Sequence, residues 1–130
     1  MQLSDLTTGL VGVLGLRFGE LSADRVELSW TVTPDQHQPD GLLHGGVHCA
    51  VVETAASVGG WIWLGDRGQV VGVSNHTDFI RGVREGELTA VATPIHRGRS
   101  QQLWLVEIRD DLERLVARGE VRLQNLEPRT

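Results

Sequence analysis

Residues 41–65 read GLLHGGVHCAVVETAASVGGWIWLG, and Glu53 is the only residue with a formal charge in this stretch. The segment Leu43–Leu64 is long and apolar enough to form a single helix. Its small residues and internal glycines have weak helix propensity, so packing against other parts of the chain must stabilise it. We therefore expect one long helix that the rest of the protein wraps around.

The surroundings of Glu53 on that helix offer no partner for its charge. The positions three and four residues away hold only small, uncharged side chains, namely Cys49, Ala50, Ala56 and Ser57. Gly46 and Gly60 extend the same face by one more turn in each direction. A face this small suits either a ligand pocket or the close approach of a second backbone.

Composition limits the possible functions. A chain of 130 residues with 40% hydrophobic residues fits one globular domain, 1–130. A net charge of −5 argues against non-specific binding to nucleic acid. Cys49 is the only cysteine, so an internal disulfide is excluded and a reducing, cytoplasmic location is expected.

Association with a membrane is not expected either. Residues 1–10 have no basic and apolar signal-peptide pattern, and the glycines, histidines and Glu53 of 41–65 argue against insertion into a bilayer. All twelve basic residues are arginine. Any contact with a phosphate must therefore come from arginine or from backbone N–H groups.

The rest of the chain predicts strands on both sides of the helix. Alternating apolar and polar residues and turn signals give six strands, at Gly9–Gly19, Asp24–Val32, Gln69–Ile80, Gly86–His96, Gln101–Arg109 and Leu115–Leu126. Met1–Thr8 could be a short helix or irregular. Strands joined by short turns favour an antiparallel sheet. A sheet with one apolar face would curl around the helix, with that face inward. The predicted class is α+β.

This order of elements resembles the hotdog-fold acyl-CoA thioesterases over about residues 10–126. The matching stretches are GLLHGGVHCAVVETAAS, VVGVSNHTDFIRGVREG and HRGRSQQLWLVEI. Within that superfamily the chain looks most like 4-hydroxybenzoyl-CoA thioesterases with a catalytic Glu on the central helix. Phenylacetate-pathway and 1,4-dihydroxy-2-naphthoyl-CoA thioesterases share the pattern. The resemblance implies an acyl-CoA substrate, with coenzyme A as part of that substrate and no separate cofactor.

Thioester hydrolysis requires a donor for the developing oxyanion and a base or nucleophile. The first turn of a helix has unpaired N–H groups, and glycine there lets a carbonyl approach. We assign the oxyanion donor to the Gly45 N–H, with Gly46 clearing space and His44 orienting the turn. Glu53 is the predicted base or nucleophile, and Ser57 would hold Glu53 or the attacking water.

Gly45 and Glu53 are too far apart to act within one chain. Eight residues of helix span roughly 12 Å, whereas reacting groups must meet within about 3–3.5 Å. The two groups must therefore come from two chains related by a two-fold axis. The resemblance implies the same composite site, with Gln38 and Gly45 from one subunit and Glu53 and Ser57 from the other. It also implies a homodimer and often a homotetramer.

Further residues are candidates for binding coenzyme A or the acyl group. Arginines near strand ends suit phosphates. Side chains alternate along Gln69–Ile80, and which set faces the acyl pocket stays open. The candidates are His76, Asp78, Phe79, Arg81, Arg84, Arg97, Arg99 and Ser100.

Other interpretations have less support. A hotdog dehydratase would pair an acidic residue with a catalytic His, but Asp40 and His44 have the wrong spacing. A non-catalytic acyl-CoA-binding module should lack Glu53. His44 and His48 have the i, i+4 spacing of a zinc helix, but Gly45 replaces the Glu of that motif, so no metal site is predicted. The acyl group itself remains open between aromatic and medium-chain fatty groups.

Overall fold

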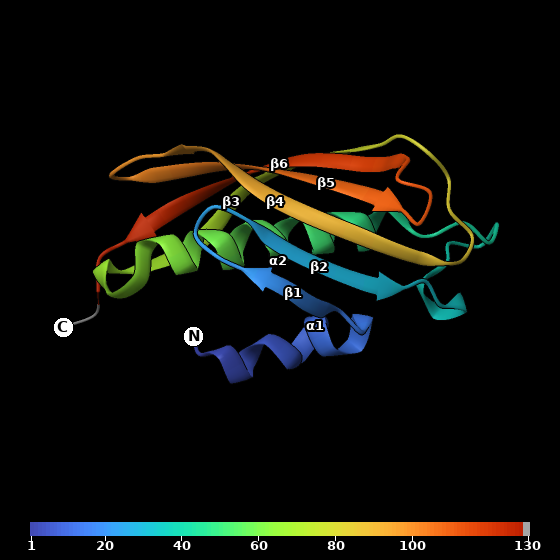
Figure 1. Cartoon of the computed structure of the whole chain (residues 1–130), viewed down its shortest axis with the longest axis horizontal. Coiled ribbons are helices and arrows are strands. Elements are labelled where there is room, and N and C mark those ends of the chain that lie inside the picture. The colour runs from blue at the N-terminus through green and yellow to red at the C-terminus, as the bar shows by residue number, and fades with distance from the viewer. Residues whose placement is uncertain (129–130) are drawn as a thin grey trace.

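Residues Gly45–Leu64 form one helix, α2, which lies against the inner face of a six-stranded sheet (Figure 1). The structure is a computed structural model that describes residues 1–128. Residues 129 and 130 of the predicted domain lie outside that range. The strands are β1 (Arg17–Leu21), β2 (Val26–Thr31), β3 (Gln69–Phe79), β4 (Glu87–Arg97), β5 (Gln101–Asp110) and β6 (Leu115–Leu126). This arrangement confirms the predicted hotdog fold.

The sheet is antiparallel throughout, in the order β1-β2-β4-β5-β6-β3. The predicted alternation is confirmed by burial, because Trp30 of β2 and Trp104 of β5 are both fully buried against the helix. Gly45–Arg67 is long and apolar enough to cross a membrane by length and composition. Half of that stretch is buried in the fold, where α2 contacts all six strands.

Two glycines near the end of α2 allow the helix to approach the sheet closely. A methyl group on Gly59 would lie 2.6 Å from the Trp104 ring, and one on Gly60 would overlap Leu123. Both glycines are buried. The weak helix propensity of this stretch is therefore offset by tight packing, as the sequence led us to expect.

We expect Gly60→Ala to destabilise the protein by about 1–3 kcal/mol, because the added methyl overpacks the contact with Leu123. Urea unfolding would measure the change. Gly19→Ala is the matched control, since a methyl there has its nearest neighbour at 3.7 Å. Equal stability of the two variants would contradict the close approach of α2 to the sheet.

The predicted strand Gly9–Gly19 is wrong over its first half. Gly9–Leu14 forms a short helix, α1, after a 3₁₀ turn, η1 (Leu3–Thr7), and only Arg17–Leu21 is a strand. Gly15 ends α1 in the left-handed conformation at φ 68°. Val11 and Leu14 of α1 pack against the core, and this tertiary contact selects the helix.

β3 is an edge strand of eleven residues with little cover in the single chain. Val71, Val73 and Phe79 expose 44%, 53% and 58% of their surfaces. A long, apolar, unpaired edge is a place where another strand can add.

Candidate active site

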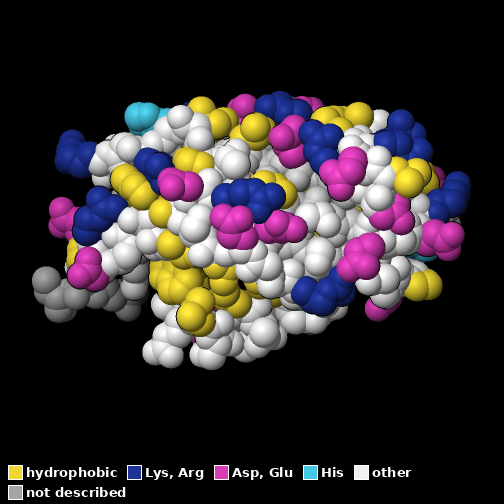
Figure 2. Space-filling view, viewed as in Figure 1, with side chains coloured by type: hydrophobic (Ala, Val, Ile, Leu, Met, Phe, Trp, Pro, Cys, Tyr) yellow, Lys and Arg dark blue, Asp and Glu magenta, His cyan; other side chains and the backbone are white. Residues whose placement is uncertain are grey.

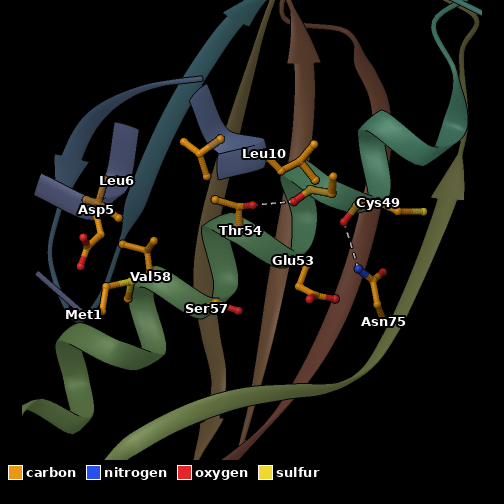
Figure 3. Close-up of a pocket in the computed structure, with 12 residues that line it drawn as sticks. Met1, Asp5, Leu6, Leu10, Cys49, Glu53, Thr54, Ser57, Val58 and Asn75 are labelled. Atoms are coloured by element: carbon orange, nitrogen blue, oxygen red, sulfur yellow. Dashed lines mark hydrogen bonds between the residues drawn. The ribbon is translucent and has the colours of Figure 1, made fainter. Parts of the chain in front are cut away.

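Glu53 and Gly45 lie on the same helix but line two different cavities. Glu53 faces a cavity of about 550 Å³, which lies over one face of α2 between the N-terminal segment and β3 (Figure 3). Gly45 lines a second cavity of about 270 Å³ together with Gln38 and Phe79. The fold thus separates the predicted catalytic residues into two groups, as the helix spacing requires.

The carboxylate of Glu53 has no partner in the single chain. Within residues 1–128, no hydrogen bond or ion pair reaches it, and its side chain is exposed toward the cavity. Gly72 of β3 lies beside it, because a methyl group on Gly72 would be 3.4 Å from the carboxyl carbon. A free carboxylate in a mainly apolar cavity is available to act as a base or nucleophile.

Ser57 lies one turn after Glu53, and both side chains point to the same side of α2 in Figure 3. Asn75 of β3 closes this side of the cavity. Its Nδ2 donates to the Cys49 carbonyl at 3.0 Å, and its Oδ1 accepts from the Thr77 hydroxyl at 2.7 Å. Asn75 therefore links β3 to the helix next to the carboxylate.

The first turn of α2 leaves one backbone donor without an acceptor. The Gly46 N–H donates to Nδ1 of His44 at 2.8 Å, and the Val47 N–H donates to the His44 carbonyl at 2.9 Å. In the described part of the chain no acceptor is found for the Gly45 N–H. His44 thus caps the helix, and Gly45 keeps a free donor. The orienting role of His44 in catalysis stays a prediction.

Gln38 lies in a loop that is held in place by hydrogen bonds to Asp40. Its Nε2 donates to Oδ1 of Asp40 at 2.9 Å, and Arg84 donates to the Asp40 carbonyl at 3.0 Å. The hydrogen bonds from Gln38 and from the Leu42 N–H hold the pKa of Asp40 below its usual value. Arg84 therefore ties down this loop, whereas the sequence predicted it as a ligand for coenzyme A.

His48 is buried one turn after Gly45, stacked on Phe79 and edge-on to Trp30, with ring centroids 5.9 and 6.4 Å apart. Burial lowers the pKa of His48 to about 4. Its Nδ1 has no hydrogen-bond partner among the described residues. His48 is therefore a neutral aromatic packing residue, consistent with the packing role favoured by the sequence.

This burial predicts a pH-dependent stability. Between pH 6.5 and about 4 the unfolded chain binds a proton at His48 that the folded chain does not bind. The free energy of unfolding should therefore fall by up to about 3 kcal/mol as pH drops through that window. Urea midpoints at pH 7.5 and 5 measure this change. His48→Phe should make the free energy of unfolding less dependent on pH. His76→Gln, on the exposed strand, should leave this pH dependence unchanged. An unchanged pH dependence in His48→Phe would contradict the assignment of the effect to His48.

The predicted ligands for coenzyme A are spread over the molecule. Arg97, Arg99 and Ser100 line a third cavity, of about 580 Å³, near the end of α2. Arg97 also donates to Asp24 at 3.0 Å and lies 5.5 Å from the centre of the Trp63 ring. Arg81 lies elsewhere, in the cavity lined by Gly45.

His76 and Asp78 lie on the face of β3 away from α2. They are exposed, Nε2 of His76 lies 3.4 Å from Oδ1 of Asp78, and neither residue lines the Glu53 cavity or the Gly45 cavity. The set of β3 side chains that faces the helix is Asn75, Thr77 and Phe79, and Phe79 contacts its first turn. A substrate-binding role for His76 and Asp78 therefore stays a prediction.

The sequence interpretation missed part of the Glu53 cavity. Met1, Asp5, Leu6, Leu10 and Val11 of the N-terminal segment line it. No single helical or strand pattern joins these residues, because the extended residue Thr8 separates η1 from α1.

The fold agrees with comparisons to known proteins. A family model described as the thioesterase superfamily matches residues 40–117. The chain belongs to the thioesterase superfamily. It is 52% identical over 119 residues to a Mycobacterium tuberculosis protein that carries the name of an esterase, covering 89% of this chain and 85% of that protein.

Two further similarities bear on the activity. The chain is 36% identical over 106 residues to the 1,4-dihydroxy-2-naphthoyl-CoA hydrolase of Escherichia coli (strain K12), covering 82% of this chain and 78% of the hydrolase. The crystal structure of S. sahachiroi AziG is 54% identical, with a TM-score of 0.91, and the match covers 92% of this chain and 98% of that one. This member of the superfamily is therefore a thioester hydrolase of the hotdog fold.

Proposed function

We propose that this hydrolase cleaves acyl-CoA thioesters with a neutral, aromatic acyl group, such as 4-hydroxybenzoyl or 1,4-dihydroxy-2-naphthoyl, in the cytosol. The observation that carries the proposal is the Glu53 carboxylate, which is unpaired and faces an apolar cavity large enough for a small molecule. The name of the Escherichia coli relative supports an aromatic substrate.

The active site forms between two copies of the chain. Glu53 and Ser57 line one cavity, and Gln38 and Gly45 line another. Each cavity of a single copy therefore holds only half of the residues that a complete active site needs. The uncovered β3 edge supports pairing with a second copy through that strand. Assembly of such dimers into a tetramer remains a prediction from the family resemblance.

Hydrolysis follows one of two routes at Glu53. As a general base, Glu53 takes a proton from water while the water oxygen attacks the thioester carbonyl. As a nucleophile, Glu53 attacks the carbonyl itself and forms an anhydride that water then cleaves. In both routes the partner's oxyanion donor is the N–H of Gly45, and the C–S bond breaks to release the coenzyme A thiolate. The proposal requires no cofactor.

The cavity at the end of α2 suits the phosphates of coenzyme A. Arg67, Arg97, Arg99 and Ser100 line it, and the Arg67 guanidinium lies 4.4 Å from the centre of the Trp63 ring. Arginine side chains bind phosphate with two parallel hydrogen bonds. Arg67, Arg99 and Ser100 are exposed, and Arg99 has no ion-pair partner among residues 1–128.

The charges around the Glu53 cavity predict which acyl groups are excluded. Among the described residues, Asp5 and Glu53 are the only ones in its lining with a charged side chain, and both are acidic. We expect adipoyl-CoA, which has a second carboxylate, to be hydrolysed at least about 10-fold less efficiently than hexanoyl-CoA of equal chain length, because like charges repel in a partly desolvated site. The kcat/KM ratio of this matched pair measures the effect, and equal values would contradict the charge argument.

Thiol release from a panel of aromatic and aliphatic acyl-CoAs tests the function. A kcat/KM of about 10⁴ M⁻¹s⁻¹ or more on an aromatic member is the expected result. Binding of the same esters without release of thiol would contradict the proposal and favour a binding module.

A further inference from the structure

The N-terminal segment, residues 3–14, forms the wall of the Glu53 cavity opposite β3. We propose that this segment selects the acyl group by size, with Leu10 as the residue that sets the limit. The inference rests on the proposed function, because it assigns the acyl portion of the substrate to this cavity.

The lining of the cavity has two chemically different sides. Toward β3 lie Glu53, Ser57 and Asn75, which carry most of its polar groups. Toward the N-terminal segment the walls are mainly apolar, with Asp5 as the one acidic side chain there, and Figure 3 shows Leu6 and Val58 on the side of α2 away from Asn75. A thioester carbonyl placed at Glu53 would therefore direct an apolar acyl group away from β3, across α2, toward η1 and α1.

The length of the cavity supports a larger acyl group than a single ring requires. Its α2 lining runs from Cys49 to Val58. Nine residues of helix correspond to roughly 13 Å. The cavity can therefore hold extended or bicyclic acyl groups as well as a single ring, and the far end of a larger group would contact the N-terminal segment.

Leu10 is placed to limit this space. It lines the cavity while exposing 60% of its surface, so its side chain is accessible from the cavity and from solvent. Leu6, by contrast, is 7% exposed and belongs to the core. Figure 2 shows hydrophobic side chains at the surface beside the N-terminus, next to this part of the molecule.

The segment can change without disturbing the sheet. Within residues 1–128, one hydrogen bond ties residues 1–14 to a distant part of the fold, from Nε2 of Gln36 to the Leu14 carbonyl at 3.1 Å. The remaining attachment is apolar contact through residues such as Leu6 and Val11. Substitutions at its exposed positions should therefore alter the cavity more than the stability.

The test compares substitutions on two sides of α1. Leu10→Trp fills the cavity, Leu10→Ala enlarges it, and Val13→Trp is the matched control, because Val13 is 80% exposed and does not line the cavity. For each full-length variant, kcat/KM is measured with 2-naphthoyl-CoA and butyryl-CoA. We expect Leu10→Trp to lower the ratio of large to small substrate by about 10-fold or more. Leu10→Ala should keep or raise the ratio, and Val13→Trp should keep the ratio of the unmodified protein.

Two results would overturn the inference while the proposed function stands: an unchanged ratio in both Leu10 variants, or an equal shift in Leu10→Trp and Val13→Trp. Absence of thiol release by the unmodified protein with either ester would instead refute the proposed function, and the inference with it. If Leu10→Trp fails to fold by circular dichroism, Leu10→Phe replaces it as a smaller increase in bulk, and it should also lower the ratio of large to small substrate. An unchanged ratio in a folded Leu10→Phe protein would then overturn the inference.

Discussion

Glu53→Gln should lower kcat for thioester hydrolysis by about 10²–10⁴-fold, with little change in the affinity for acyl-CoA. The amide has the shape of the carboxylate but can neither accept a proton nor attack the carbonyl. Because no described residue pairs with Glu53, the substitution breaks no structural contact. The expected loss is therefore in chemistry and not in folding.

Steady-state thiol release and calorimetric binding of the ester separate these two effects. Glu85→Gln is a matched control, because Glu85 is exposed and lies outside the Glu53 and Gly45 cavities. Equal kcat in Glu53→Gln and the control would show that Glu53 is neither base nor nucleophile, and the mechanism would be wrong.

Gly45→Ala should lower kcat/KM by about 10²-fold, comparable to the loss of one oxyanion donor. A methyl group at this position would lie 2.6 Å from the Phe79 ring, so the ring must move into the space that the thioester oxygen needs beside the Gly45 N–H. Phe79 is 58% exposed and can move without unfolding the protein.

Stability provides the control for this second variant. Alanine has the higher helix propensity, by about 1 kcal/mol, so urea unfolding should show a stability close to that of the unmodified protein. Undiminished activity in a folded Gly45→Ala protein would remove Gly45 as the oxyanion donor. Loss of activity together with loss of stability would instead assign Gly45 a structural role.

The long helix and most of the sheet could be predicted because their patterns extend over many residues. Trp104 and its neighbours on Gln101–Asp110 alternate over four buried positions, which leaves little doubt about the strand. Gly9–Leu14 is only six residues long, and its apolar residues fit either period. Its structure depends on the packing of Val11 and Leu14 against the core, which is a tertiary effect, and on the turn at Gly15.

The candidate site could be predicted where the local sequence carried the signal. Glu53 was identified because no neighbour on the helix can neutralise it, and Gly45 because it opens the helix. The side chains of β3 could not be assigned, because an irregularity between Gly72 and Ser74 shifts the alternation. As a result Gly72 and Asn75, three residues apart, both face α2. The roles of the arginines likewise depend on partners distant in sequence, as the Arg84 contact with Asp40 illustrates.

A site that uses Glu53 of one chain and Gly45 of its partner can be restored by mixing two inactive proteins. Glu53→Gln and Gly45→Ala chains are unfolded together in urea and refolded, and thiol release from the best acyl-CoA is measured. Half of the dimers then contain one chain of each kind, and each of these has one intact site, so activity should return to about a quarter of that of the unmodified protein. Mixed dimers that form, as shown by differently tagged chains, but remain as inactive as either parent would contradict the shared active site.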